Sequence, residues 1–319
     1  MTLPGLRTIH SAHAHYGWDA SLAPVHTVAP GETLTLSCRD AGDGQIGPDA
    51  TPATVAALDA SRANPVTGPV AVDGARPGDV LVVEILDFAP SGAGWTAVIP
   101  GFGLLADQFP DPALHLWRYD PAGTAPLAFG RLAEVPFAPF LGTIGLAPAA
   151  PGTHSVIPPR RVGGNMDIRE LRAGTTLYLP VEVAGALLSA GDTHAAQGDG
   201  EVCGTAVESA MDVTLRLDLI RDTALAFPRY ETAGPRPGDA ERPGVTATTG
   251  IGADLMQAAR DAVSGMIDHL ARSRSVSAAD AYMLCSVAAD LAISEVVDAP
   301  NWVVSCALPR ALFADRASV

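Results

Sequence analysis

Lysine is absent from this sequence of 319 residues, and all 20 of its basic residues are arginine. The absence excludes hydrolytic mechanisms in which lysine acts as a base, among them the Ser-Ser-Lys and Glu-Lys-Cys triads, because arginine cannot be deprotonated in a protein. It also excludes Schiff-base chemistry and lysine-bound pyridoxal phosphate. Any catalysis must therefore use carboxylate, imidazole, thiol or hydroxyl groups, with or without a metal ion.

Cysteine is also scarce. The four cysteines, Cys38, Cys203, Cys285 and Cys306, show no CxxC spacing. A chain of this size with four scattered thiols does not have a disulfide framework, so we expect them to be reduced. No basic segment followed by an apolar run marks a signal peptide, and no apolar stretch approaches the roughly 18 residues that a membrane span requires. We therefore expect a cytoplasmic protein.

Positive charge is in short supply overall. The formal net charge is −15 and the sequence pI is about 4.8. A phosphate backbone or an anionic membrane surface would be repelled by such a chain. We expect neither nucleic acid nor membrane as a partner, and a small molecule is the remaining expectation.

The composition predicts a mainly β fold. Apolar residues make up 48% of the chain, while 32 glycines and 27 prolines interrupt it throughout, which favours short strands and turns over long helices. A Pro/Gly-rich stretch at 233–243 suggests a boundary between a β-rich body, residues 1–240, and an α+β C-terminal part, residues 241–319. The body is expected to carry the functional site.

Local patterns add detail to this division. Residues 22–39 are typical of a strand, a turn at Pro30-Gly31 and a second strand, and we expect them to form a hairpin-like opening. Residues 90–151 have little periodicity and are expected to line a pocket or interface. Helical spacing of apolar residues predicts one helix over 253–273 and a second, capped by Ser277, that continues to residue 293. A strand is expected at 302–308.

One Gly-rich segment carries the main candidate for a site. Asp192 and His194 are two residues apart, as on one face of a strand, and Glu201 follows among glycines that let the backbone wrap closely. Mixed oxygen and imidazole ligands suit a divalent metal, with zinc the first choice and calcium the second. The structural alternative is a Gly-rich turn with a hydrogen-bonded aspartate and a surface histidine.

Further candidates lie elsewhere in the chain. Asp167 follows two glycines, and Asp40 follows a strand; we expect both to join the metal site, although each is also typical of a turn residue. Asn165 is expected to bind substrate. The remaining candidates are Gln197 as a further substrate-binding residue, and His15 and Asp199 as additional members of the site.

Cys203 offers a metal-free alternative. It lies close to Glu201 and His194 in the sequence, so a Cys-His pair could supply a nucleophile and its base. A cysteine flanked by Val202 and Gly204 is also typical of a small buried residue. The sequence leaves both interpretations open.

In these residues and the segments around them, the chain resembles the acetamidase/formamidase family, which is distinct from the nitrilase-type and Ser-Ser-Lys amidases. The resemblance covers most of the chain. Its segments are HYGWDASLAPV (15–25), RDAGDGQI (39–46), NPVTGPVAVDGARPGDVLVVEIL (64–86), GWTAVIPGFGLL (94–105), PFLGTIGLAPAAPG (139–152), PPRRVGGNMDIREL (158–171), LYLPVEVAGALLSAGDTHAAQGDGEVCGTAVE (177–208) and TTGIGADLMQAA (248–259).

The resemblance implies a β-sandwich body with a further small β element, an α+β C-terminal part and a homo-oligomer. It implies hydrolysis of formamide, acetamide or a similar short amide to carboxylate and ammonia. Asp40, Asp167, Asp192 and His194 match the pocket and metal site, and Glu201 is expected to move the proton. A non-catalytic β-sandwich protein that binds a metal or ligand remains the alternative from another class.

Overall fold

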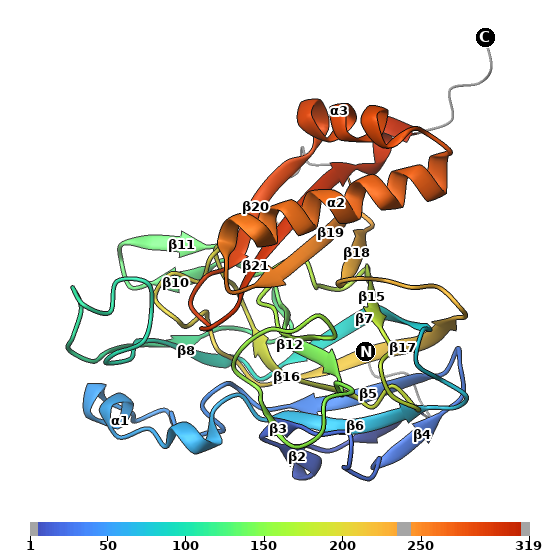
Figure 1. The fold of residues 1–319 in the computed structure, drawn as a ribbon. Coiled ribbons are helices and arrows are strands. Elements are labelled where there is room, and N and C mark those ends of the chain that lie inside the picture. Colours follow the sequence, from blue (N-terminus) through green and yellow to red (C-terminus); the bar gives the residue numbers. More distant parts are fainter. Residues whose placement is uncertain (1–5, 235–243, 314–319) are drawn as a thin grey trace.

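Two β-sheets pack face to face around a shared hydrophobic core in this computed structural model (Figure 1). Over the residues that the structure describes, 6–234 and 244–313, the larger sheet has nine strands. In spatial order they are β1 (Arg7–Ile9), β5 (Thr33–Cys38), β17 (Met211–Ile220), β7 (Val80–Pro90), β15 (Thr175–Pro180), β18 (Arg229–Thr232), β19 (Val245–Gly252), β21 (Trp302–Pro309) and β20 (Asp290–Glu295).

The smaller sheet contains the strand that carries the candidate site. Its described strands are β14 (Gly163–Asn165), β12 (Phe140–Leu146), β16 (Leu188–His194), β6 (Val66–Val72) and β2 (Ala14–His15), with β4 (His26–Val28) also paired to β6. The short two-stranded pairs are β8 (Ala93–Val98) with β9 (Ala113–Arg118), β10 (Leu127–Phe129) with β11 (Ala133–Val135), and β3 (Gly17–Trp18) with β13 (His154–Ser155).

Side-chain burial explains why the two sheets face each other. In β17, Val213, Leu215 and Leu217 are buried while the residues between them are not, so one face of this strand meets the core. All residues of β6, β12 and β16 are buried, because both faces of the smaller sheet are covered at its centre. A mainly β fold with a sandwich body is confirmed.

The C-terminal part adds helices to the larger sheet. Helices α2 (Leu255–Arg274) and α3 (Ala278–Ala288) pack with β19 and β21 around a second apolar cluster (Figure 1). Ser277 accepts a hydrogen bond from the Asp280 N–H and caps α3, as predicted. The boundary proposed at residue 240 lies outside the described residues. Because β18 and β19 are paired, the larger sheet runs through both parts of the chain.

Two local predictions were wrong. The second helix ends at Ala288 and not at residue 293, since Asp290–Glu295 pairs with β21 as a strand. The opening segment is no hairpin, because β4 pairs with β6 in the smaller sheet while β5 pairs with β1 and β17 in the larger one. The stretch 90–151 lines two cavities, as expected, and it contains the short strands β8 to β12, which are too brief for sequence periodicity to detect.

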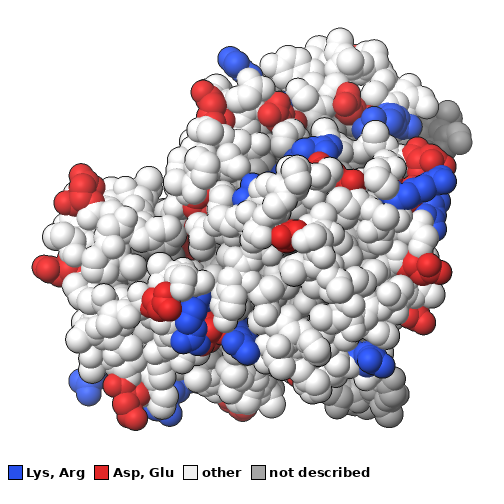
Figure 2. Space-filling model, turned by 60° about the horizontal axis from the view of Figure 1, so that its bottom comes forward, with Lys and Arg blue, Asp and Glu red and all other residues white. Residues whose placement is uncertain are grey.

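The remaining helical elements are short. Helix α1 (Pro52–Ala56) is preceded by a Thr51 capping box, and 3-10 turns cover Ser11–His13, Ala60–Arg62 and Arg310–Phe313. Within the described ranges, no helix is long and apolar enough to cross a membrane. Acidic and basic side chains are dispersed over the face of the molecule drawn in Figure 2.

Candidate active site

Strand β16 brings Asp192 and His194 into the buried centre of the smaller sheet. It lies between β12 and β6, and its pairing with β12 omits Gly142 and Asp192, where the backbone departs from regular strand geometry. Asp192 has a φ of 50°, in the left-handed region that aspartate tolerates better than most residues. The two side chains converge, with His194 Nε2 lying 3.0 Å from Asp192 Oδ1.

Two loops deliver further carboxylates to the same place. Asp167 follows β14, and Glu201 lies in the loop after β16; their φ angles are both 46°. Left-handed backbone at non-glycine residues costs of order 1 kcal/mol or more and persists only where the surrounding structure enforces it. The surrounding structure therefore fixes the positions of Asp167, Asp192 and Glu201.

Glu208 completes a compact group with Asp192 and His194. An isolated β-bridge sets its backbone beside His194, and its Oε2 lies 3.1 Å from His194 Nε2. Its Oε1 accepts a hydrogen bond from the Ala206 N–H at 2.7 Å. One ligand atom from each of the three residues lies within 4.8 Å of the others, as in a metal site. Asp167, His194 and Glu201 form a second group that meets the same condition.

The hydrogen bonds of Gln197 distinguish between these two groups. Its Nε2 donates to the Asp167 carbonyl oxygen at 2.9 Å, so its Oε1 is the atom that faces His194 Nδ1, also at 2.9 Å. Because that oxygen can only accept, Nδ1 of His194 must carry a proton. In the neutral ring, the lone pair then lies on Nε2 and points at Asp192 and Glu208. The imidazole ligand thus belongs to the Asp192–His194–Glu208 group.

The electrostatics of this group suit a cation. Burial alone would lower the pKa of His194, but the carboxylates of Glu208 and Asp192 outweigh it and raise that pKa well above its usual value. Burial raises the pKa of Glu208 to about 7. Burial opposes the ionisation of Asp192, yet the charge of His194 and its hydrogen bonds lower the pKa of Asp192. The position beside Nε2 can therefore be taken by a proton or by a metal ion.

Asp167 and Glu201 differ in character from this group. Burial, followed by neighbouring carboxylates, raises the pKa of both groups well above the usual range. Asp167 is fully buried, and neither of its carboxylate oxygens has a hydrogen-bond partner among the described residues. An unpaired buried polar group costs about 1–3 kcal/mol, so its retention indicates a ligand or a proton at this position.

The C-terminal part contributes two carboxylates that the sequence did not predict. Asn165 Nδ2 donates to Asp298 Oδ2 at 2.5 Å, and Glu295 Oε1 accepts from the Asp298 N–H at 2.5 Å. Burial, together with Asp167 and Glu295, raises the pKa of Asp298 well above normal. Two acids shortly after one another at the end of a strand were the available signal. Glu208, also unpredicted, stood at the end of the segment that carries the resemblance.

The other expected residues have different surroundings. The Asp40 carboxylate accepts hydrogen bonds from Trp95 Nε1 and from backbone N–H groups of its own turn, and it belongs to neither metal-compatible group of the described residues. His15 contacts the Ser189 hydroxyl and the Gly17 carbonyl. Asp199 lies exposed, 3.6 Å from the Arg169 guanidinium. The roles expected for these three residues stay predictions.

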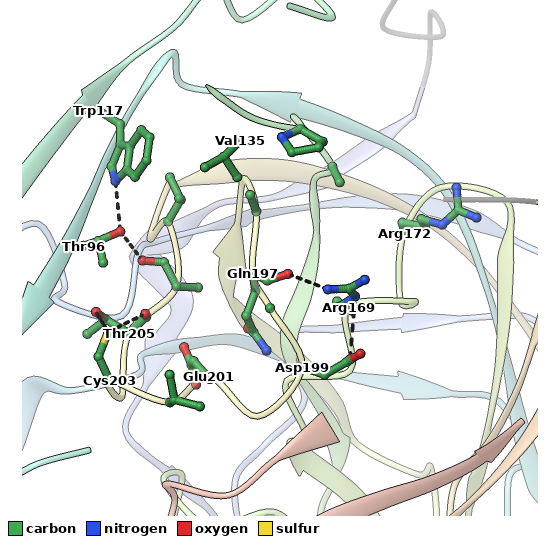
Figure 3. Close-up of a pocket in the computed structure, with 17 residues that line it drawn as sticks. Thr96, Trp117, Val135, Arg169, Arg172, Gln197, Asp199, Glu201, Cys203 and Thr205 are labelled. Carbon is green, nitrogen blue, oxygen red and sulfur yellow. Dashed lines mark hydrogen bonds and ion pairs between the residues drawn. The ribbon is translucent and has the colours of Figure 1, made fainter. Parts of the chain in front are cut away.

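Cys203 lies on a different cavity. Figure 3 shows it with Gln197, Asp199 and Glu201 along the loop that follows β16, and Glu201 lines this cavity as well as the one over the carboxylates. The Cys203 thiol contacts the backbone carbonyl and the hydroxyl of Thr205. Both ring nitrogens of His194 are engaged with Gln197, Asp192 and Glu208. The geometry gives the proposed Cys-His pair no support.

A cavity of about 460 Å³ lies over the carboxylates. Asn165, Asp192, Glu201, Glu208 and Asp298 line it together with apolar residues from α1 and the loop after β8. This volume falls within the range of small-molecule sites. Asn165 is thus placed where a substrate could contact it, whereas Gln197 lies behind His194.

The structure thus places buried carboxylates and a histidine, in groups that could hold a metal ion, under a small cavity of a β-sandwich protein. The chain belongs to the acetamidase/formamidase family, whose model matches residues 7–155 and 149–315. The acetamidase of Mycolicibacterium smegmatis is 32% identical over 275 residues, 65% of this chain and 66% of that protein. The formamidase of Methylophilus methylotrophus is 31% identical over 271 residues, 65% of this chain and 64% of that protein.

The likeness extends to solved structures. An acetamidase from Bacillus halodurans matches with a TM-score of 0.86 at 31% identity, covering 96% of this chain and 98% of that one. This chain spans just under two thirds of the length of the Mycolicibacterium smegmatis acetamidase and of the Methylophilus methylotrophus formamidase. Family membership and fold are therefore established.

Proposed function

We propose that this protein is a metal-dependent amidase that hydrolyses a small amide to a carboxylate and ammonia. The main support is the buried Asp192–His194–Glu208 group. The Nε2 lone pair of His194 and the carboxylate oxygens converge beneath a cavity of about 460 Å³. The names of the relatives, acetamidase and formamidase, support the reaction class.

The donor set fits a divalent ion. One imidazole nitrogen and two carboxylates are the ligands that zinc takes in catalytic sites, and calcium would draw on the oxygens alone. Glu208 Oε2 is buried and makes no hydrogen bond within the described residues, and it lies 3.1 Å from His194 Nε2. A divalent ion bound there would polarise the amide carbonyl and acidify water.

The protein's own groups then supply binding and proton transfer. Asn165 lines the cavity and is held by Asp298, so it can orient the polar end of the amide. Glu201 reaches the same cavity, and burial raises its pKa well above the usual value, which favours the protonated carboxyl group. That proton passes to the leaving nitrogen, which departs as ammonia, and the proton of the attacking water returns to Glu201.

His194 is positioned by the groups around it. Gln197 fixes its tautomer, and Phe140 packs edge-on against its ring at 5.0 Å between centroids. Such supporting contacts keep a ligand in one orientation and are part of a metal site's affinity. A cytoplasmic location and a homo-oligomeric state complete the proposal and stay predictions.

Ammonia release from formamide, acetamide and propionamide tests the proposal. We expect release by the metal-replete protein, loss on chelation, and loss in Asp192→Asn and Glu201→Gln. Asp73→Asn, at an exposed aspartate on the turn between β6 and β7, is the control and should keep the parent rate. Metal binding with no ammonia from any amide would instead support a non-catalytic metal-binding protein, and activity that survives chelation but not alkylation would support Cys203.

A further inference from the structure

The cavity over the carboxylates is much larger than the amides that the relatives' names suggest. Its volume is about 460 Å³. A water molecule takes up about 30 Å³ in the liquid, so acetamide, with four non-hydrogen atoms, would occupy roughly 100 Å³. Most of the cavity would therefore stay filled with water around such a substrate.

The walls away from the metal-compatible group are mostly apolar, with Gln45 and Asp59 as polar members. They come from helix α1 with the turn after it, from β8 and the loop that follows it, and from the segment after β13. The large apolar side chains in this wall are Val55, Leu58, Trp95, Ile99, Phe102 and Ile157. Water in contact with such surface is displaced favourably by an apolar group.

Charge narrows the choice of occupant. No arginine is among the described residues that line this cavity, and the chain has no lysine. The acids that line it include Asp59, whose carboxylate accepts hydrogen bonds from the Ser61 N–H and hydroxyl. A substrate that carries a carboxylate in addition to its amide group would place that charge near no cation and near several anions. A neutral apolar group is the occupant that these walls can accept.

We propose that the preferred substrates are primary amides of larger apolar acids, with an acyl chain of about six carbons or an aryl group, rather than formamide or acetamide. This inference rests on the proposed amidase function and adds the substrate class. The amide end lies at Asn165 and the metal-compatible group, and the acyl group extends along the apolar wall toward α1.

A series of straight-chain amides tests it. Burying one methylene contributes about 0.8 kcal/mol, so kcat/KM should rise about fourfold for each methylene that enters the cavity. From acetamide to hexanamide, four methylenes longer, the expected gain is roughly 200-fold. A carboxylate at the far end of the chain, as in a dicarboxylic monoamide of equal length, should remove the gain.

Two substitutions on one helix provide the matched pair. Ala56 lines the cavity, whereas Ala53, three residues earlier on α1, does not. Ala56→Phe should reduce kcat/KM for hexanamide at least tenfold while leaving acetamide within about threefold, because only the long chain reaches this wall. Ala53→Phe should leave both substrates unchanged.

The outcomes separate the two proposals. If acetamide is hydrolysed as well as or better than hexanamide, the substrate class is wrong and the amidase function stands. If no amide of the series yields ammonia with metal-replete protein, the amidase function itself fails. An equal loss for both substrates in Ala56→Phe would also overturn the placement of the acyl group.

Discussion

Gly142 offers the sharpest perturbation of the site without touching a candidate ligand. A Cβ atom at this position would lie 2.6 Å from Asp167 Oδ1, 2.7 Å from His194 Cε1 and 2.8 Å from the Asp192 carbonyl oxygen. Its φ is not in the left-handed region, so Gly142→Ala adds a methyl group without a backbone penalty of its own. The added methyl must therefore displace the groups around it.

The expected size of the effect follows from the crowding. Inserting a methyl group into a packed interior costs typically 1–3 kcal/mol, and all three contacts are closer than a Cβ atom tolerates. A shift of about 1 Å in a catalytic group lowers the rate about 100-fold. We expect Gly142→Ala to lose about 1–3 kcal/mol in the free energy of unfolding and about 100-fold in kcat/KM.

The assay combines urea unfolding, metal titration and ammonia release. Gly198→Ala is the matched control, because it lies in the loop after β16 and its Cβ would meet nothing within 4 Å. That variant should remain close to the parent protein in all three measurements. A Gly142→Ala protein that binds metal and hydrolyses amides like the parent would refute the placement of the site.

Three further predictions concern orientation and charge. Gln197→Leu removes the acceptor at Nδ1 of His194 and should weaken metal binding about 10- to 100-fold in a chelator competition, with Asp73→Asn as the control. An unchanged metal affinity would contradict the tautomer argument. Burial raises the pKa of Glu295 to about 7 from 4.5, so metal-free protein should lose up to about 3 kcal/mol of stability as pH rises from 4.5 to 7. Glu295→Gln should remove this loss when urea unfolding is measured at several pH values. If the unfolding free energy falls equally with pH in both proteins, the prediction is wrong. Burial opposes the ionisation of Asp43, but hydrogen bonds from two arginines and a tyrosine outweigh it and lower the pKa of Asp43. The stability that this carboxylate contributes is present above its unfolded pKa and is lost as pH falls through the lower folded value, so Asp43→Asn should destabilise the protein more at pH 7 than in acid. A difference in unfolding free energy that does not change with pH would count against the ion pairs.

Local sequence patterns identified much of the fold because the strands and helices follow their burial periods. β17 alternates between buried and less buried residues, and α2 keeps helical spacing between Ala258, Ala262 and Met266. The pairing of strands could not be derived in this way. β4 and β5 are neighbours in sequence but lie in different sheets, because each pairs with partners far along the chain.

In the candidate site too, contacts between residues close in sequence could be predicted and contacts between distant residues could not. Asp192 and His194 share a strand, so their spacing alone suggested that they converge. Glu208 reaches His194 through a β-bridge, and Asp298 reaches Asn165 across 133 residues of sequence, contacts that no local pattern encodes. Asp40 follows a strand near the site, yet its carboxylate is engaged by Trp95 and its own turn.

Metal content measured together with ammonia release tests the central claim most directly. The purified protein, its chelator-stripped form and Asp192→Asn would each be analysed for bound metal and then incubated with acetamide and hexanamide. The account predicts a bound divalent ion in the parent, loss of both metal and ammonia release on stripping, recovery of both on adding the metal back, and neither in Asp192→Asn. Full ammonia release by the metal-free protein would contradict it.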